Sequence, residues 1–179
     1  VLFHAAAGGV GLIFCQWARH LGATVIGTVS TPEKAEIAKA HGCHHVLPYQ
    51  GFAAKVNEIT GGKGCAAVYD AVGKDTIMDS FACLRPRGVL ANFGAASGPV
   101  PPIDTALLQP RSLFFTRPGL GDYTATRADL ETGTKRMFDL VERGIVKIEV
   151  NQSYPLKDAA EAHRAIEGRK TTGSTVLVP

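Results

Sequence analysis

Short apolar runs alternate with longer segments of helical periodicity through the first two thirds of the chain. Apolar runs of this length are typical of buried β-strands, and apolar residues three and four apart predict helices that cover them. The predicted strands cover residues 1–4, 24–28, 45–47, 66–70, 88–93 and 112–116, and the predicted helices between them cover residues 9–21, 31–41, 52–60 and 76–84. Strands that alternate with helices predict βαβ units, and therefore an α/β fold with a doubly wound parallel sheet.

The pattern changes after residue 118. Residues 127–143 have the periodicity of a long amphipathic helix, residues 146–150 and 175–178 resemble strands, and residues 157–167 resemble a helix. This order lacks a βαβ rhythm. We therefore expect one domain over residues 1–118 and a C-terminal α/β appendage over residues 119–179.

A glycine-rich turn follows the first predicted strand, in the run AAAGGVG of residues 5–11. In the G-x-G-x-x-G spacing of a dinucleotide-binding turn, Ala6 holds the first position and Gly8 and Gly11 hold the others. Gly8 would let the backbone approach a pyrophosphate, and Gly11 would let the helix pack close to the strand. The free N–H groups at the start of this helix would bind phosphates. The turn thus favours a Rossmann domain that binds a dinucleotide, and a tight turn without a ligand is the alternative.

The residues after the second strand indicate which dinucleotide is bound. Folds that bind NAD place an acidic residue at the end of this strand, where it bonds the ribose 2′-hydroxyl. Here that position holds Ser30, and Lys34 follows nearby. A hydroxyl and an ammonium would bind a 2′-phosphate, so we expect NADPH, with Glu33 pointing away. The segment also fits a helix start, with Thr31 as N-cap and Pro32 in the first turn.

The composition excludes several classes of protein. A hydrophobic content of 45%, a charged content of 20% and a net charge of +3 are ordinary for a globular domain. No basic run favours nucleic acid, and no apolar stretch is long enough to span a membrane. The four cysteines are scattered, and no secretory signal precedes the first strand, so we expect free thiols, no metal site and a cytoplasmic location. Because the sequence starts inside a strand, we also expect a fragment of a longer protein.

Motifs along the whole chain resemble the medium-chain dehydrogenase/reductase superfamily. Within it, the chain is most similar to the zinc-independent quinone oxidoreductase branch that includes zeta-crystallin. The matching motifs, in the family's order, are HAAAGGVG at 4–11, VYDAVG at 68–73, NFG at 92–94, TRP at 116–118, YPL at 154–156 and GRKTTG at 168–173. Each motif alone is weak, and together they are specific for the C-terminal half of these enzymes.

The resemblance implies a path for the cofactor across the ends of the strands. The pyrophosphate would lie along Gly8, Gly9, Val10 and Gly11. The 2′-phosphate would be held by Ser30 and Lys34, and the adenine would lie beside Tyr49. The path of the ribose and the nicotinamide would be lined by Val72, Phe93, Gly94 and Ala95. The nicotinamide would contact Thr116, Arg117 and Pro118, and the cofactor phosphates would contact Arg169. Positions at strand ends support most of these roles. For Arg169 only the resemblance speaks, and a solvated surface arginine is the alternative.

The implied reaction is hydride transfer from NADPH to a quinone or a conjugated carbonyl such as an enone. Because the cofactor supplies the chemistry and the reduced quinone takes its proton from water, we assign no catalytic residue. Asp70, at the end of the fourth strand, is expected to be a structural carboxylate bonded to nearby backbone N–H groups. The family's N-terminal GroES-like catalytic domain is missing from this sequence, and residues 119–179 would pack on it. We therefore expect this chain to bind NADPH with little or no turnover.

Family members pair through the edge of the nucleotide-binding sheet. The corresponding strand, from Ser112 to Thr116, is apolar and carries no charge, which is typical of an edge that another chain covers. We therefore expect a homodimer through this strand.

Other functions fit the sequence less well or stay open. A short-chain dehydrogenase needs a Tyr-x-x-x-Lys pair, and none of the four tyrosines is followed by lysine at that spacing. A methyltransferase would need an acidic residue where Ser30 lies. An enoyl reductase of the same superfamily and a cofactor-binding module without turnover are the open alternatives.

Overall fold

The computed structural model describes residues 1–179 and contains a six-stranded parallel sheet in the order β3-β2-β1-β4-β5-β6. The strands are β1 (Leu2–His4), β2 (Ile26–Val29), β3 (His45–Pro48), β4 (Cys65–Asp70), β5 (Leu84–Asn92) and β6 (Phe114–Thr116). The strand order reverses between β1 and β4, where doubly wound sheets open a crevice for ligands. The predicted Rossmann-type α/β fold is therefore confirmed.

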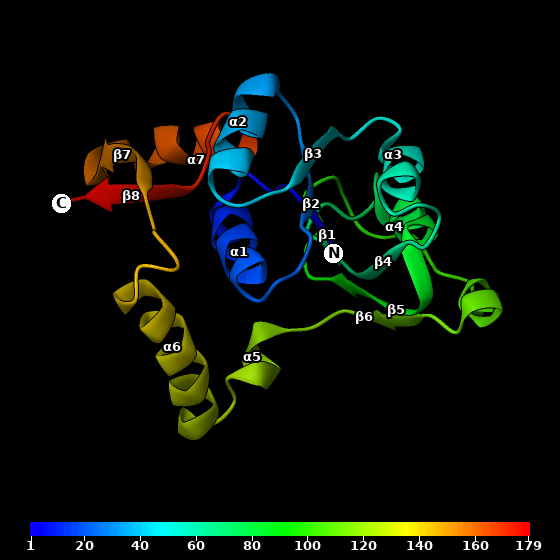
Figure 1. Ribbon diagram of the computed structural model, residues 1–179. Coiled ribbons are helices and arrows are strands. Elements are labelled where there is room, and N and C mark those ends of the chain that lie inside the picture. Colours follow the sequence, from blue (N-terminus) through cyan, green and yellow to red (C-terminus); the bar gives the residue numbers. More distant parts are fainter.

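Two pairs of helices cover the two faces of this sheet (Figure 1). On one face lie α1 (Gly9–His20) and α2 (Pro32–Ala40), and on the other lie α3 (Phe52–Ile59) and α4 (Ile77–Ala82). The start of α2 is capped as predicted, because the Thr31 hydroxyl accepts the Lys34 N–H at 3.3 Å and Pro32 is the first helical residue. Coverage of both faces explains why the strands are apolar runs rather than alternating patterns.

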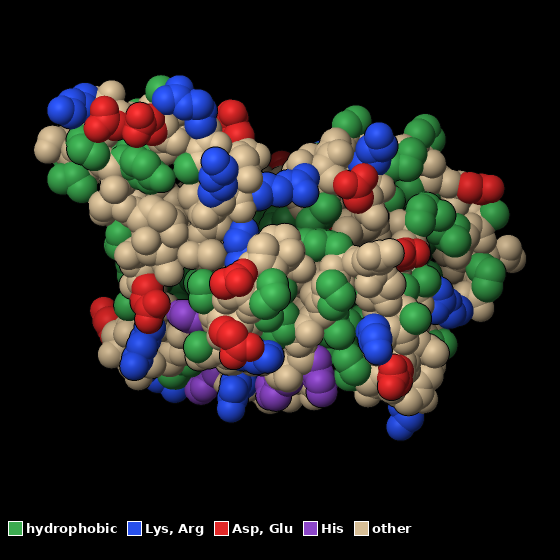
Figure 2. Space-filling model, turned by 90° about the horizontal axis from the view of Figure 1, so that it is seen from above, with side chains coloured by type: hydrophobic (Ala, Val, Ile, Leu, Met, Phe, Trp, Pro, Cys, Tyr) green, Lys and Arg blue, Asp and Glu red, His purple; other side chains and the backbone are tan.

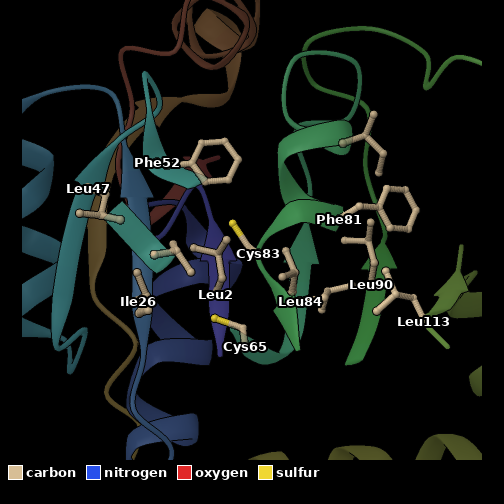
Figure 3. Close-up of a cluster of buried hydrophobic side chains, with 13 residues drawn as sticks. Leu2, Ile26, Leu47, Phe52, Cys65, Phe81, Cys83, Leu84, Leu90 and Leu113 are labelled. Atoms are coloured by element: carbon tan, nitrogen blue, oxygen red, sulfur yellow. The ribbon is translucent and has the colours of Figure 1, made fainter. Parts of the chain in front are cut away.

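Two hydrophobic clusters lie between the helices and the sheet. The cluster on the α3–α4 face has 13 buried residues, among them Leu2 of β1, Phe52 of α3 and Phe81 of α4 (Figure 3). The cluster on the α1–α2 face has eight, mostly small, such as Ala6 and Ala38. Small residues on that face let α1 approach the sheet closely. All four cysteines are buried free thiols, as predicted.

Of the six strands of the main sheet only β3 begins at the predicted residue; β1, β2 and β4 differ by one or two residues, and β5 and β6 differ for reasons that the backbone shows. Strand β5 starts at Leu84 instead of Gly88, because Leu84 pairs with Cys65 before a register shift that contains Arg87 at φ +59°. Strand β6 starts at Phe114 instead of Ser112, whose left-handed backbone (φ +51°) ends the preceding 3-10 turn.

The C-terminal part contains α5 (Leu120–Tyr123), α6 (Arg127–Glu142), β7 (Val150–Pro155), α7 (Ala159–Glu167) and β8 (Ser174–Val178). Strands β7 and β8 pair in parallel with α7 between them, so the expectation that this region lacks a βαβ unit was wrong. The predicted strand at 146–150 was also wrong. There, the N–H of buried Val146 bonds Leu140 O at 3.1 Å and the N–H of Lys147 bonds Gln16 Oε1 at 2.9 Å. These bonds to α6 and α1 replace strand pairing.

The segment between α7 and β8 returns to the glycine turn. The Gly173 N–H donates to Ala7 O at 3.0 Å, and Gly173 and Gly8 form an isolated parallel bridge. In contrast, α6 lies away from the main sheet (Figure 1) and exposes Phe138. None of the helices combines the length and the apolar character that a membrane crossing requires.

Candidate functional site

The glycine turn joins β1 to α1 in a tight conformation. Ala5 adopts a left-handed backbone (φ +58°), and its carbonyl accepts the Gly8 N–H at 2.9 Å. Ala5, the residue with the left-handed backbone, therefore comes one residue before Ala6, which holds the first glycine position of the G-x-G-x-x-G motif. At Gly11, an added Cβ would lie 2.5 Å from Ala5 O and 2.6 Å from Ala6 O. The close approach of helix and strand therefore requires glycine at this position.

A cavity of about 310 Å³ opens beside this turn at the carboxyl ends of the strands. Figure 2 shows a hollow on this face with Lys and Arg side chains at its rim. The residues that line the cavity are Ala5, Ala7, Gly8, Val29, Ser30, Lys34, Tyr49, Val72, Asp75, Thr76, Ala96, Arg169 and Thr171. The volume lies in the range of small-molecule sites. The structure thus brings six predicted residues together: Gly8, Ser30, Lys34, Tyr49, Val72 and Arg169.

Two basic residues that line the cavity, Lys34 and Arg169, are joined through the Arg169 backbone. The Lys34 ammonium donates to the Arg169 carbonyl at 2.7 Å, and the Arg169 guanidinium donates to Ala96 O at 3.3 Å. Arg169 itself has a left-handed backbone (φ +56°). Neither side chain forms an ion pair within the chain, so both charges are available to an anion. The carboxylate of Glu33 bonds Thr31, which lowers its pKa, and it does not line the cavity.

Asp70 is the buried carboxylate below this site. Its Oδ1 accepts the N–H groups of Val72 at 2.8 Å and Gly73 at 2.9 Å, which confirms the predicted structural role. The hydroxyls of Thr76 and Ser80 donate to its Oδ2 at 2.9 and 3.0 Å. With four donors around it, the charge of Asp70 is satisfied within the protein.

His4 is a buried residue of this region that the sequence did not single out. It is fully buried at the end of β1, and its ring contacts the hydroxyls of Thr28 and Ser80. Burial lowers the pKa of His4 to about 4, although the negative charge of Asp70 acts in the other direction and raises it. Burial likewise raises the pKa of Tyr49. A histidine that ends an apolar strand was the available signal, since a buried histidine needs hydrogen-bond partners.

The remaining predicted residues lie outside the cavity. Of the turn residues, Gly9 packs against the Gly173 carbonyl and Val10 is exposed. After β5, the Phe93 ring packs in a tilted orientation on Phe3 with centroids 5.8 Å apart, and Gly94 approaches the Ala71 backbone. The predicted residues outside the cavity are Gly9, Val10, Gly11, Phe93, Gly94, Ala95, Thr116, Arg117 and Pro118. Arg117 lines a second cavity of about 350 Å³ beside Phe115.

The sequence missed seven of the lining residues: Ala5, Ala7, Val29, Asp75, Thr76, Ala96 and Thr171. Asp75 and Thr76 lie where α4 begins, immediately after the VYDAVG motif, and that position was a usable signal. Ala96 and Thr171 lie in loops whose place at the cavity no local pattern announces.

The sequence profile of the zinc-binding dehydrogenase family matches residues 9–138. The chain belongs to this family. A 2-haloacrylate reductase from a Burkholderia species is 54% identical over 183 residues, which cover 100% of this chain and 55% of that protein. A quinone oxidoreductase from Pseudomonas aeruginosa is 51% identical, over 100% of this chain and 56% of that protein. The resemblance to quinone oxidoreductases of the medium-chain superfamily is thus confirmed.

Solved structures of this dehydrogenase family agree with the fold. The crystal structure of Escherichia coli quinone oxidoreductase complexed with NADPH superposes with a TM-score of 0.94 at 46% identity, over 99% of this chain and 56% of that one. The structure of a 2-haloacrylate reductase superposes with a TM-score of 0.90 at 54% identity, over 99% and 56%. The chain therefore spans little more than half the length of these relatives.

Proposed function

We propose that this chain binds NADPH and forms the cofactor-binding part of an NADPH-dependent quinone oxidoreductase. The observation that carries the proposal is the cavity beside the glycine turn, whose rim holds Ser30, Lys34 and Arg169 and no carboxylate at the position of Ser30. A hydroxyl, an ammonium and a guanidinium suit a 2′-phosphate. Relatives named quinone oxidoreductase, one of them in complex with NADPH, support the same function.

Different residues of the site would contact different parts of the cofactor. Gly8 and the N–H groups at the start of α1 would face the pyrophosphate, with Gly9, Val10 and Gly11 completing the turn. Lys34 and Ser30 would hold the 2′-phosphate, and Tyr49 and Val72 would flank the adenosine. Bound NADPH supplies a hydride to the quinone. The end of the path toward the nicotinamide would be formed by Phe93, Gly94, Ala95, Thr116, Arg117 and Pro118.

A second substrate class has specific support. The relative that is 54% identical is named a 2-haloacrylate reductase, an enzyme whose named substrate carries a conjugated alkene. Hydride transfer to an activated C=C bond uses the same cofactor geometry as transfer to a quinone. Rates of NADPH oxidation with a benzoquinone and with 2-chloroacrylate, measured on the complete polypeptide, would decide between them.

We further propose that the enzyme works without zinc, in the cytoplasm and as a homodimer. The resemblance to the quinone oxidoreductase branch, which implies an enzyme without zinc, supports zinc independence. The four free thiols suit a reducing compartment. Strand β6 is the last strand of the main sheet, and its Phe114 is exposed, which supports pairing through this edge.

Calorimetric titration with NADPH and NADH tests the cofactor. We expect NADPH to bind more tightly than NADH, and Lys34→Ala to weaken NADPH binding about 10- to 100-fold while changing NADH binding little, because a charge-assisted bond to the 2′-phosphate is lost. Lys39→Ala is the matched control, since Lys39 lies on the same helix and pairs with Glu36 outside the cavity. Equal affinity for both nucleotides would contradict the assigned 2′-phosphate site.

A further inference from the structure

The loop between α7 and β8 (residues 168–173), called here the α7–β8 loop, ends against the glycine turn. The Gly173 N–H donates to Ala7 O at 3.0 Å, and Gly173 and Gly8 form a parallel bridge. The Gly8 N–H donates to Ala5 O at 2.9 Å. Both polar groups of the peptide between Ala7 and Gly8 are therefore bonded within the chain. The orientation of this peptide thus depends on a residue from the C-terminal part of the chain.

The same loop supplies part of the cavity wall. Arg169 and Thr171 both line the cavity, only a few residues before Gly173. The Arg169 carbonyl also accepts the Lys34 ammonium at 2.7 Å. The α7–β8 loop is therefore joined to the site twice, at Lys34 and at the glycine turn, and a shift of the loop would disturb both places.

Asn151 of β7 contacts Gly173 from the side opposite the glycine turn. Its Oδ1 accepts the Ser174 N–H at 3.2 Å. A Cβ added to Gly173 would overlap this Oδ1 atom, and Gly173 has a left-handed backbone with φ +51°. A side chain at Gly173 would therefore be both strained and without space. Gly173 is thus enclosed between the turn and Asn151.

Strand β7 is irregular at Asn151. Val150 pairs with Ser174 and Gln152 pairs with Thr175, so Asn151 is an extra residue between two pairs that are consecutive on β8. Such an extra residue is a β-bulge, which redirects a side chain and is common beside functional sites. The Thr175 hydroxyl donates to Gln152 Oε1 at 2.9 Å, which fixes the strand just after the bulge. The bulge thus leaves the Asn151 side chain free to bond the first residue of β8.

We propose that Asn151 is a positioning residue for the nucleotide, which acts through Gly173 to hold the α7–β8 loop on the glycine turn. The proposal rests on NADPH binding in the cavity, as proposed above. Asn151 does not line the cavity, so it acts on the cofactor only through the loop. A turn and a loop that are fixed before binding lower the ordering cost that the nucleotide would otherwise meet.

NADPH calorimetry on Asn151 variants tests this role. Asn151→Leu removes the acceptor with little loss of volume, and we expect it to weaken binding about 3- to 10-fold, since the bond that orders the loop is lost. Asn151→Asp keeps an oxygen that accepts the Ser174 N–H and should weaken binding less. Gln16→Leu is the matched control, because the Gln16 amide accepts the Lys147 N–H at 2.9 Å and lies outside the cavity.

Urea unfolding of the same variants separates positioning from simple support of the β7–β8 pair. The dissociation constant is measured on folded protein, so a residue that only stabilises this pair would affect stability and leave NADPH affinity unchanged. Asn151→Leu with a lower free energy of unfolding and the affinity of the parent would overturn the proposal. Should Asn151→Leu fail to fold, Asn151→Ala removes the same acceptor without a branched side chain and is expected to weaken binding to the same degree.

Amide NMR gives a readout that does not need the cofactor. In Asn151→Leu the Gly173 N–H should exchange with solvent faster than in the parent, and the Gly8 signal should shift, whereas Gln16→Leu should change neither. Unchanged Gly173 exchange and Gly8 shift in Asn151→Leu would show that Asn151 does not hold the loop. Failure of the unsubstituted chain to bind NADPH, with Gly173 protected, would instead contradict the proposed function and the positioning role that rests on it.

Discussion

At the scale of single residues, the crevice of this sheet depends on polar groups that are buried yet satisfied. His4 and Asp70 are both inaccessible to solvent at adjacent strand ends. Asp70 is held as an anion by four donors, whereas His4 has one donor and one acceptor for a neutral ring. Protonation of His4 would therefore place a new charge in the interior when the pH falls.

The stability of the chain should reflect this between pH 4 and 6.5. Burial lowers the pKa of His4 from an ordinary value of 6.5 to about 4 in the folded chain. The unfolded chain then binds more protons than the folded chain in this range, so the free energy of unfolding rises with pH, by at most about 1.4 kcal/mol per unit from this residue. The contribution is fully present above pH 6.5 and is lost as the pH falls toward 4.

Urea unfolding of the chain and of His4→Asn across pH 4.5 to 7.5 measures this contribution. Asparagine does not titrate, so the difference in unfolding free energy between the two proteins should shrink as the pH falls. His20→Asn removes an exposed histidine and should leave the pH dependence of the parent. Parallel curves for the parent and His4→Asn would show that His4 titrates normally.

At the scale of elements, the two long helices use glycine in opposite ways. In α1, Gly11 is buried where the helix crosses the strand before it, and an added Cβ would meet the Ala5 and Ala6 carbonyls. In α6, Gly133 lies in the middle of the helix with no atom within 4 Å of an added Cβ. The first glycine is required by packing, and the second only weakens its helix.

The same substitution should therefore have opposite effects in the two helices. Gly133→Ala should raise the free energy of unfolding by about 0.5–1 kcal/mol, because alanine reduces the conformational entropy of the unfolded chain and favours the helix. Gly11→Ala should lower it by about 1–3 kcal/mol through overpacking against rigid backbone. Urea titration of both variants measures the changes. A loss of stability in Gly133→Ala would indicate that α6 packs on something at this position.

At the scale of the whole molecule, large apolar side chains are exposed at several places, and at two of them the side chain is a phenylalanine that is more than half exposed. One is the edge strand β6, where Phe114 is 60% exposed next to unpaired backbone groups. The other is α6, where Phe138 is 63% exposed. Only the edge strand offers backbone hydrogen bonds to a second copy in addition to apolar contact. The homodimer that we propose therefore uses β6.

Light scattering at micromolar concentration should give the mass of a dimer, and Phe114→Lys should give that of a monomer, because a charge at the edge opposes strand pairing. Phe138→Lys alters an equally exposed phenylalanine on α6 and should leave the dimer intact. A dimer that is lost only in Phe138→Lys would place the contact on α6.

Local rules were sufficient to predict most of the nucleotide-binding fold. The alternation of apolar runs and helical segments predicted the six parallel strands, and the cap at Thr31 and Pro32 predicted the start of α2. The rules failed at 146–150, where an alternating apolar pattern bonds to α1 and α6. They predicted β8 and α7 but missed the parallel pairing of β7 with β8, because the 18-residue gap between these strands contains a short helix and a loop that local patterns do not join into one unit.

The sequence by itself determined the fold, the glycine turn and the side chains Ser30 and Lys34 at the crevice, since strand ends and turns follow from neighbouring residues. Only the tertiary structure decided which residues meet there. Arg169 reaches the cavity from 135 positions beyond Lys34, and His4 joins Ser80 across 76 positions. Such pairings depend on how the sheet and the C-terminal segment pack. No local pattern encodes them, because the partners become neighbours only after the chain has folded.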